Sequence, residues 1–450
     1  MKKFLSVFKR NFGAKTIANG IVRVPNLSDA NLKLGPHDFV LDGDASSFDI
    51  SNAGEAIKYI RFNSDTKFPS IDKMPKGFNP TQILENGKVP GLGISKLHDA
   101  GITGKNVTIA IIDQALNTEH IEIKDNIIHY ESIGYPDTIE ASFHGTAVSS
   151  LLVGKTLGVA PDAKIVYFAA ANVKRKNIIQ ILRSDKKVQQ SIQQILPKDF
   201  TFEDLIKGIS ENKYATDVGF KKTVDDIMQK LPDDVKKRLN TEDTEVIFKN
   251  YAMALKKILL MNSRLPKDKK ISAVSISWGT LLEDEECRNL MKMLIETGVM
   301  VLPTSAGRLY GDQGSFKTID RKMNENPDDI KSYEPGFWKD FNSQPRDCIL
   351  VPAGGRTVAG YHSNQDYMYC GADAGMSWAT PYLVGVYALA KQISPNLTPQ
   401  HFFEIAHNTG AQNEVLGHND VIQPEKIIKY LQNENTLQIK QPEISIQLEK

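Results

Sequence analysis

The chain has few cysteines and no long apolar run. Its three cysteines, Cys287, Cys348 and Cys370, are too few and too odd in number for the disulfide framework of a small secreted scaffold, which favours a reducing compartment. No stretch reaches the ~20 apolar residues that a membrane-spanning helix needs, so we expect no transmembrane segment. At the amino terminus two basic pairs enclose five residues, 4–8. A signal peptide needs an apolar core of ~7 to 15 residues, so the sequence predicts a cytoplasmic protein.

The chain also lacks an excess of either charge. Its 55 basic and 54 acidic residues leave a formal net charge of +1, which does not indicate nucleic acid or an anionic membrane as the main partner. Apolar residues make up 41% and charged residues 24% of the 450 residues. These values are typical of soluble globular proteins and exclude collagen-like and wholly disordered chains. At one domain per ~100 to 200 residues, we expect two to four structural units.

Strand and helix patterns alternate from about residue 90. Continuous β-branched runs at 107–112 and 163–169 are typical of strands that are buried on both faces, as in parallel sheets. Similar runs follow at 273–277, 299–303 and 348–352, and helical stretches separate them. This alternation predicts an α/β fold with a mostly parallel central sheet flanked by helices.

The first part of the chain follows a different pattern. Residues 1–85 are polar and rich in loop-forming residues, so we interpret them as an N-terminal extension. Their acidic run at 42–49 superficially suggests a calcium-binding loop. Because the ligand spacing of an EF-hand is missing, a solvated turn is favoured.

A second region interrupts the alternation of strands and helices. Residues 172–262 show helical periodicity throughout. Within them, Thr201 and Asp204 have the spacing of a helix cap. They predict a mostly helical insertion. Residues 172–270 contain 22 Lys and Arg against 14 Asp and Glu. Since these basic residues are spread out and are not interleaved with aromatics, a solvated helical face is favoured over a nucleic-acid patch.

Three polar side chains stand at the ends of regular elements. Asp113 ends the earliest buried run, at the edge where open α/β sheets bind their ligands. His144 opens a helix of small residues that closes at Gly154 and is able to approach the sheet closely. Ser377 lies in the first turn of a long helix, near unpaired backbone N–H groups that favour an adjacent oxyanion. Taken singly, each has an ordinary alternative: a turn residue, a surface histidine and a helix cap.

Together the three supply the parts of a base-activated nucleophile, in which serine attacks, histidine moves the proton and aspartate orients the imidazole. With Asp113 at a strand end, His144-Gly145-Thr146 at a helix start and Gly-Met-Ser-Trp-Ala-Thr-Pro at 375–381, the sequence resembles the subtilisin-like serine peptidases, the subtilases of peptidase family S8. The three motifs agree with the family in residue type, chain order and structural setting.

The resemblance covers roughly residues 85–430 and implies how the chain is organised. It implies a subtilisin-like three-layer fold, with a peptidase domain at 86–432 that contains the insertion at 172–262. Family members commonly carry an N-terminal propeptide, and the extension at 1–85 is expected to resemble one. Residues 433–450 are expected to form a C-terminal tail.

The resemblance also implies residues that bind the substrate. The segment 275–279 falls where the family forms the wall of a cleft that pairs with an extended peptide through backbone hydrogen bonds. Its candidate residues are Ser275, Ser277, Trp278 and Gly279. The family usually supplies an asparagine amide to the oxyanion hole, whereas this sequence has Arg308 at the corresponding position. Loss of one such donor costs about 100- to 1000-fold in turnover without abolishing catalysis.

The sequence therefore predicts a serine endopeptidase, a hydrolase that cleaves polypeptides through an acyl-enzyme with Asp113, His144 and Ser377. The departure at Arg308 leaves an alternative open, a catalytically impaired protein of the same fold that binds peptides or regulates a partner. A nucleotide-binding α/β protein would need a glycine-rich loop between a strand and a helix, but Gly91-Leu92-Gly93 precedes the first strong strand. No cofactor is expected to be required. Calcium is common in the family, but no metal site can be assigned by residue, and the sequence predicts no oligomeric state.

Overall fold

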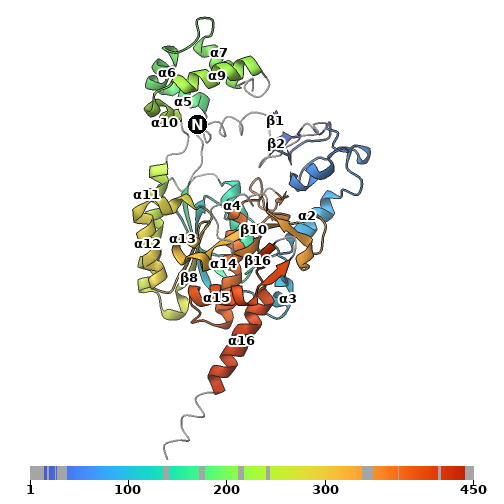
Figure 1. Cartoon of the computed structure of the whole chain (residues 1–450), viewed down its shortest axis with the longest axis vertical. Helices are drawn as coiled ribbons and strands as arrows, with labels where there is room; N and C mark the ends of the chain where they lie inside the picture. Colours follow the sequence, from blue (N-terminus) through green and yellow to red (C-terminus); the bar gives the residue numbers. More distant parts are fainter. Residues whose placement is uncertain are drawn as a thin grey trace, which may run out of the picture. The chain divides into compact units, whose positions relative to one another are not determined.

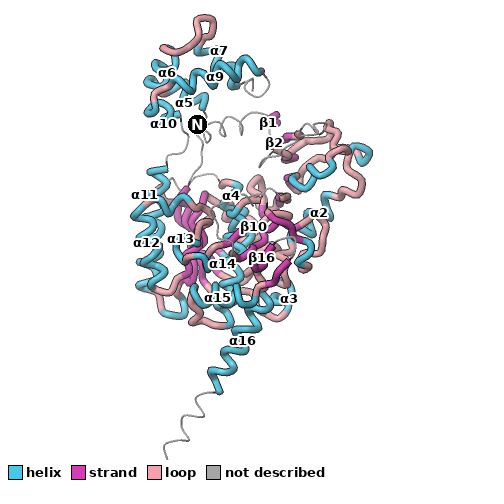
Figure 2. The backbone as a smooth tube through the Cα atoms, in the orientation of Figure 1, coloured by secondary structure: helices cyan, strands magenta, loops and turns pink. Residues whose placement is uncertain are grey.

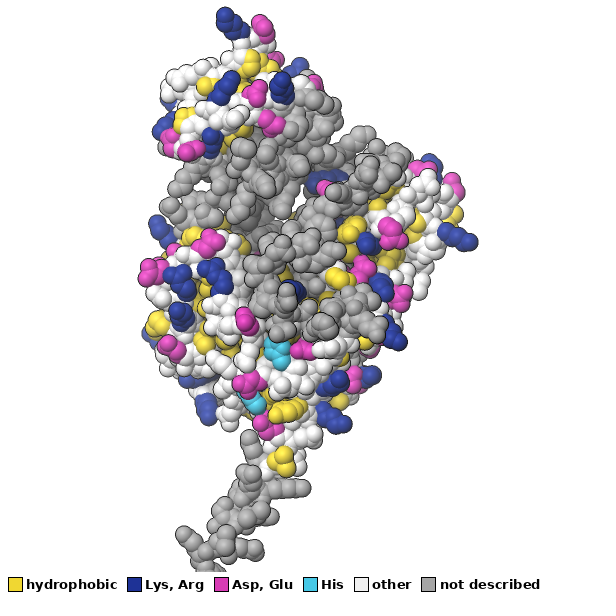
Figure 3. Space-filling model, viewed as in Figure 1, with side chains coloured by type: hydrophobic (Ala, Val, Ile, Leu, Met, Phe, Trp, Pro, Cys, Tyr) yellow, Lys and Arg dark blue, Asp and Glu magenta, His cyan; other side chains and the backbone are white. Residues whose placement is uncertain are grey.

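The computed structural model describes residues 15–17, 20–25, 27, 38–134, 141–171, 178–210, 217–239, 244–336, 348–372, 374–413 and 417–440. The chain forms two compact units. We call Met1–Arg23 with Asn172–Ile247 the helical unit, and Val24–Ala171 with Phe248–Lys450 the larger unit. On the face drawn in Figure 3, basic and acidic side chains are interspersed on each unit, in agreement with the near-zero net charge.

A five-stranded parallel sheet forms the centre of the larger unit, as the sequence predicted (Figure 1). Its strand order is β6-β7-β5-β8-β9, and every neighbouring pair is parallel. The central strand β5 is buried from Ile109 to Asp113, because both of its faces are covered. The strands are β5 (Thr108–Gln114), β6 (Ile127–Ser132), β7 (Lys164–Ala171), β8 (Ile271–Ile276) and β9 (Met300–Pro303).

Helices lie on both sides of this sheet (Figure 2). Helix α4 packs on β5 and β7, α14 packs on β8 and α4, and α12 packs on β9. Helix α14 is buried from Trp378 to Ala390, because α4, α16 and β8 all pack against it. The helices are α2 (Pro80–Lys88), α3 (Ile94–Asp99), α4 (Phe143–Val153), α12 (Glu285–Glu296), α13 (Gly307–Tyr310), α14 (Met376–Ile393), α15 (Pro399–Thr409) and α16 (Pro424–Lys440).

Helix α16 continues into the predicted C-terminal tail as far as Lys440, and residues 441–450 lie outside the described part of the chain. Among the helices that the structure describes, none combines the length and the apolar character that crossing a membrane would demand.

The predicted strand at 348–352 belongs to a different sheet. It forms β12 (Ile349–Pro352), which pairs in parallel with β10 (Phe316–Arg321) and β16 (Gly417–Val421). Strands β11 (Tyr333–Pro335) and β15 (Ala411–Asn413) complete this second sheet. The fifth strand of the parallel sheet is β6, which the sequence analysis missed because its residues are only partly buried. A buried apolar run indicates a strand, but it does not indicate which sheet the strand joins.

Residues 38–90, which we call the N-terminal segment, are part of the larger unit. Strand β3 (Val40–Asp42) pairs in parallel with β4 (Arg61–Asn63). Strand β4 in turn pairs antiparallel with β14 (Tyr367–Cys370), which forms a hairpin with β13 (Arg356–Ala359). The segment therefore contributes β3 and β4 to the sheet that contains β14. In the chain, β14 is the strand that comes before α14 and the predicted nucleophile Ser377.

The acidic run at 42–49 is a solvated turn only in part. Asp44 and Asp49 are exposed, and each accepts hydrogen bonds from the serine two residues later. Asp42, by contrast, is 7% exposed. The sequence pattern did not distinguish this buried carboxylate from its exposed neighbours.

The helical unit has a hydrophobic core of its own. Its helices are α5 (Ile178–Ser184), α6 (Lys186–Gln193), α7 (Phe202–Ser210), α9 (Val218–Lys230) and α10 (Asp233–Leu239), with a hairpin of β1 (Lys15–Ile17) and β2 (Gly20–Arg23). The backbone N–H of Thr201 donates to Asp204 Oδ2 at 2.9 Å, and the reciprocal bond from Asp204 to Thr201 Oγ1 is 3.1 Å. The long helix α11 (Thr244–Arg264) begins in this unit, but from Phe248 it belongs to the larger unit.

Ile206→Ala tests whether the core of the helical unit is separate from the core of the larger unit. Ile206 is 3% exposed within the core of the helical unit, so its truncation is expected to lower the stability of that unit by about 2 to 5 kcal/mol. Hydrogen exchange should accelerate across 178–239 and stay unchanged in β5 and β8. The neighbouring exposed residue supplies the control, Lys207→Ala, which should change neither. Equal acceleration in both units would contradict separate cores.

Candidate active site

The parallel sheet and helix α4 bring Asp113 and His144 into contact. Asp113 lies at the carboxyl end of β5 and is 3% exposed, and His144 is the second residue of α4. His144 Nδ1 lies 2.7 Å from Asp113 Oδ1. Because a carboxylate accepts, Nδ1 carries the proton, and Nε2 is left with a lone pair that can accept one.

Glycine allows α4 to approach the end of β5 this closely. A Cβ atom at Gly145 would collide with the carbonyl oxygen of Gln114 and would lie 2.5 Å from the hydroxyl of Tyr167. The Tyr167 hydroxyl donates to the same Gln114 carbonyl oxygen. The small residue that follows His144 is therefore a steric requirement of the Asp113–His144 contact.

The surroundings of His144 change its basicity. Burial is the largest influence and disfavours the imidazolium, but the negative charge of Asp113 and its hydrogen bond outweigh burial. The pKa of His144 consequently lies above the usual value for histidine, although Arg61 opposes the increase through its positive charge. A carboxylate that stabilises the imidazolium is what a general base needs once it has taken a proton.

Helix α14 presents Ser377 in its first turn, after Gly375 in an extended conformation. The hydroxyl of Ser377 donates to the carbonyl oxygen of Ser277 at 3.1 Å, and the Ser277 hydroxyl donates to the carbonyl oxygen of Ser377 at 3.0 Å. These reciprocal bonds join the start of α14 to the residue that follows β8. In this arrangement the hydroxyl proton of Ser377 is directed at the carbonyl oxygen of Ser277.

Aromatic rings connect the histidine to the start of α14. The ring of Trp378, which follows Ser377, lies 5.6 Å from the His144 ring in an edge-to-face arrangement. Phe143 lies 6.0 Å from Trp378 and 5.9 Å from Tyr361. The structure thus joins Asp113 to His144 directly and places Ser377 one residue from a ring that contacts the imidazole.

The predicted cleft residues occupy different environments. Ser277 contacts Ser377 directly, whereas Ser275 is 2% exposed within β8. Trp278 stacks on Phe248 at 5.5 Å, and the carbonyl oxygen of Gly279 accepts from Ser305 at 3.0 Å. Ser277 is therefore the cleft candidate that touches the predicted nucleophile.

Arg308 is exposed in the short helix α13. Its Nη2 donates to the carbonyl oxygen of Leu282 at 3.4 Å, and Arg288 Nη1 donates to the same oxygen at 2.8 Å. The Arg308 guanidinium therefore bonds to the segment that follows β8 in the chain. Over the described residues, no group of three or more His, Cys, Asp or Glu side chains is arranged to hold a metal ion.

Comparison with known proteins shows several similarities. Residues 104–357 match the model of the subtilase family, Peptidase S8. The minor extracellular protease Vpr of Bacillus subtilis (strain 168) is 31% identical over 94 residues, a match that covers 18% of this chain and 12% of Vpr. The chain therefore corresponds to a small part of that relative.

Two solved structures have lower sequence identity. One comes from work on the assembly of the subtilase cytotoxin SubAB, with 13% identity, a TM-score of 0.46 and coverage of 79% of this chain and 99% of that chain. The other is a cold-adapted subtilisin-like serine proteinase, with 14% identity, a TM-score of 0.38 and coverage of 71% of this chain and 89% of that chain.

The raised pKa of His144 leads to a prediction about its titration. NMR of protein with labelled histidine is expected to show His144 titrating above the ordinary value of ~6.5. Asp113→Asn removes the charge that stabilises the imidazolium, so the titration should move to lower pH. The exposed Asp44 offers a matched control, Asp44→Asn, which should leave it in place. An unshifted His144 titration in Asp113→Asn would show that the carboxylate does not stabilise the imidazolium.

Proposed function

This chain belongs to the subtilase family of serine peptidases, and we propose that it is an endopeptidase that cleaves polypeptides through an acyl-enzyme. The observation that carries the proposal is the 2.7 Å contact between the buried Asp113 and His144, beside the helix start that presents Ser377. These three side chains carry the carboxylate, imidazole and hydroxyl groups that base-activated acyl transfer requires, which supports the proposal.

The reaction starts when Ser377 rotates toward His144. Nε2 of His144 takes the hydroxyl proton while Oγ bonds to the carbonyl carbon of the substrate, and Asp113 stabilises the imidazolium. The imidazolium then gives this proton to the nitrogen of the leaving amine, and the peptide C–N bond breaks. In the second half of the reaction, His144 takes a proton from water, and the water oxygen attacks the carbonyl carbon of the ester between Ser377 and the substrate. The proton returns to Ser377 Oγ as the acid product leaves.

The oxyanion formed in each half is stabilised first by the backbone N–H of Ser377. This group lies in the first turn of α14, where N–H groups have no acceptor within the helix and the helix dipole is positive. Arg308 is the proposed second donor, and its guanidinium has to leave the Leu282 carbonyl oxygen to serve in that role.

An alternative function is a catalytically impaired protein that binds or regulates through the same cleft. It is favoured by the engagement of Arg308 with Leu282 and by the bond from the Ser377 hydroxyl to Ser277 rather than to His144. Such a protein would bind peptides along the cleft but would leave Ser377 unreactive toward an active-site-directed reagent.

Ser377→Ala separates these two functions. In the wild type, a fluorophosphonate is expected to label one serine and to block cleavage of a mixed peptide library. Ser377→Ala should eliminate both labelling and cleavage without changing the circular dichroism spectrum. The exposed Ser263 supplies a matched control, Ser263→Ala, which should retain both activities. Unchanged cleavage in Ser377→Ala would reject the mechanism, and an unlabelled wild type would favour the impaired protein.

Variants of Arg308 test the second oxyanion donor. If its guanidinium stabilises the oxyanion, Arg308→Ala is expected to lower kcat by about 100- to 1000-fold with little change in KM. Arg308→Asn should recover part of the loss by supplying an amide donor. Arg288 donates to the same carbonyl oxygen of Leu282 and supplies a matched control. Arg288→Ala should leave kcat near the wild-type value. A wild-type kcat in Arg308→Ala would assign the oxyanion to other donors.

A further inference from the structure

The loop at 360–366, between β13 and β14, contacts the chain four residues after Asp113 and directly before His144. Asn117, four residues after Asp113, donates to the carbonyl oxygen of Ser363 at 2.9 Å and to Asn364 Oδ1 at 3.1 Å. Phe143, which precedes His144, packs on Tyr361. At its carboxyl end the loop continues into β14, the strand that comes before α14 and Ser377 in the chain.

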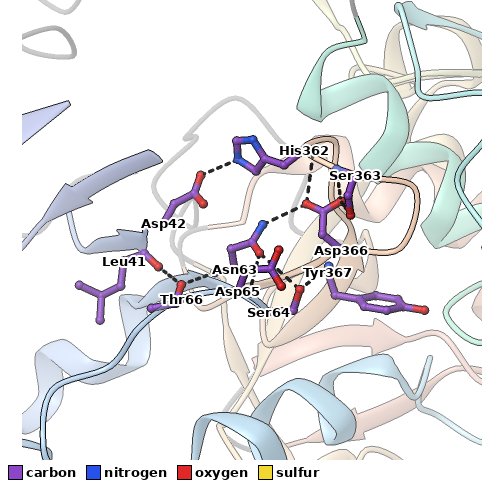
Figure 4. A network of polar contacts seen from close by, with 10 residues as sticks. All are labelled: Leu41, Asp42, Asn63, Ser64, Asp65, Thr66, His362, Ser363, Asp366 and Tyr367. Carbon is purple, nitrogen blue, oxygen red and sulfur yellow. Dashed lines mark hydrogen bonds and ion pairs between the residues drawn. The ribbon is translucent and has the colours of Figure 1, made fainter. Parts of the chain in front are cut away.

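The N-terminal segment holds this loop through two side-chain contacts (Figure 4). His362 Nε2 lies 3.1 Å from Asp42 Oδ2, and Asn63 Nδ2 donates to Asp366 Oδ2 at 3.1 Å. Asp366 Oδ1 also accepts from the backbone N–H of Ser363 at 2.9 Å. In Figure 4 the side chains of Asp42 and His362 point toward one another from the two sides of this contact.

The contact with His362 favours the ionised form of Asp42. Burial raises the pKa of Asp42, the hydrogen bond and charge of His362 lower it, and the charges of Asp366 and Asp65 raise it further. His362 is thus the partner that favours an ionised Asp42. Without it, a mostly buried carboxylate would face two other acidic groups with no compensating partner, which is unfavourable.

The backbone of the N-terminal segment also supports the strand that leads to the nucleophile. The antiparallel pairing of β4 with β14 continues past Cys370, since Gly371 N–H donates to the Ile60 carbonyl oxygen at 3.1 Å. Ala372 N–H then donates to the Lys58 carbonyl oxygen at 2.7 Å. A Cβ at Gly371 would lie 2.8 Å from the Ile60 carbonyl oxygen, so this approach requires glycine.

Apolar packing makes removal of the segment costly. Phe62 in β4 is 1% exposed and stacks on Tyr369 of β14 at 5.3 Å. Phe39, Leu41 and Ile60 are also buried. Departure of the segment would expose these side chains and would leave β14 as an unpaired sheet edge.

We propose that the N-terminal segment is a permanent part of the catalytic unit, in which Asp42, Asn63 and His362 are positioning residues that act through the loop at 360–366. This proposal rests on the proposed peptidase function. The segment supports β14 by backbone pairing, and its two polar contacts hold the loop that touches Asn117, which follows Asp113 by four residues, and Phe143, which precedes His144. A removable leader would instead have to leave before the site became active.

A double-mutant cycle in the full chain tests the Asp42–His362 contact. Asp42→Ala and His362→Ala are each expected to lower kcat and the rate of fluorophosphonate labelling by about 10- to 100-fold, because small displacements of reacting groups have effects of that size. KM should change by less than about twofold, and the double variant should lose no more than either single one. His362→Gln, whose amide can donate to Asp42, should recover most of the rate.

The control lies in the same segment. Asp44 is an exposed carboxylate that pairs with Lys67 at 3.7 Å, so Asp44→Ala should match the wild type. Rates are normalised to the amount of protein that can be labelled at saturation. A lower thermal midpoint in Asp42→Ala and His362→Ala with an unchanged kcat, or losses that add in the double variant, would overturn the positioning role.

The intact mass of the labelled protein gives a result that does not depend on the folding of any variant. The active, fluorophosphonate-labelled species is expected to retain residues 38–90. A labelled species that lacks them and cleaves peptides at the full rate would overturn the proposal. Failure of the wild type to react at all would overturn the peptidase function, and with it this inference.

Discussion

The Asp113–His144 hydrogen bond is the interaction on which the rest of the site depends. Asp113 is 3% exposed, so its carboxylate needs hydrogen-bond partners, and its Oδ1 contacts both the His144 imidazole and the backbone N–H of Gln114. The contact requires a strand that ends at Asp113 and a helix that can reach this end, which Gly145 permits. Helix α14 then contributes Trp378, whose ring contacts the imidazole edge-to-face. The same bond fixes the tautomer that leaves Nε2 free to accept a proton.

The proposed nucleophile, Ser377, is held from two directions. At the parallel sheet, Ser277 and Ser377 exchange hydrogen bonds that join the residue after β8 to the start of α14. At the other sheet, β14 pairs with β4, and the next two residues, Gly371 and Ala372, donate to the carbonyl oxygens of Ile60 and Lys58. The proposed acyl transfer needs a closely fixed serine, and these bonds restrict the movement of the chain at Ser377 and before it.

Much of the site could be predicted because its residues stand at recognisable ends of elements. Asp113 follows a β-branched run, His144 opens a helix of small residues, and Ser377 lies in the first turn of a long apolar helix. The direction of Arg308 could not be predicted, since a long side chain has many rotamers and its acceptor lies in another loop. Asp42 and His362 could not be paired either, because 320 positions separate them in the sequence.

What the sequence determined by itself is local: which runs form buried strands, which residues begin helices, and the family to which the chain is similar. Only the tertiary structure decided which segments meet. It assigned the run at 348–352 to the second sheet, placed the half-exposed β6 in the first, and joined the N-terminal segment to β14. The physical reason is that periodicity along a strand or helix reports whether its own faces are buried. The partner that covers each face is chosen by packing between residues far apart in the chain, and that packing leaves no periodic signal in the sequence.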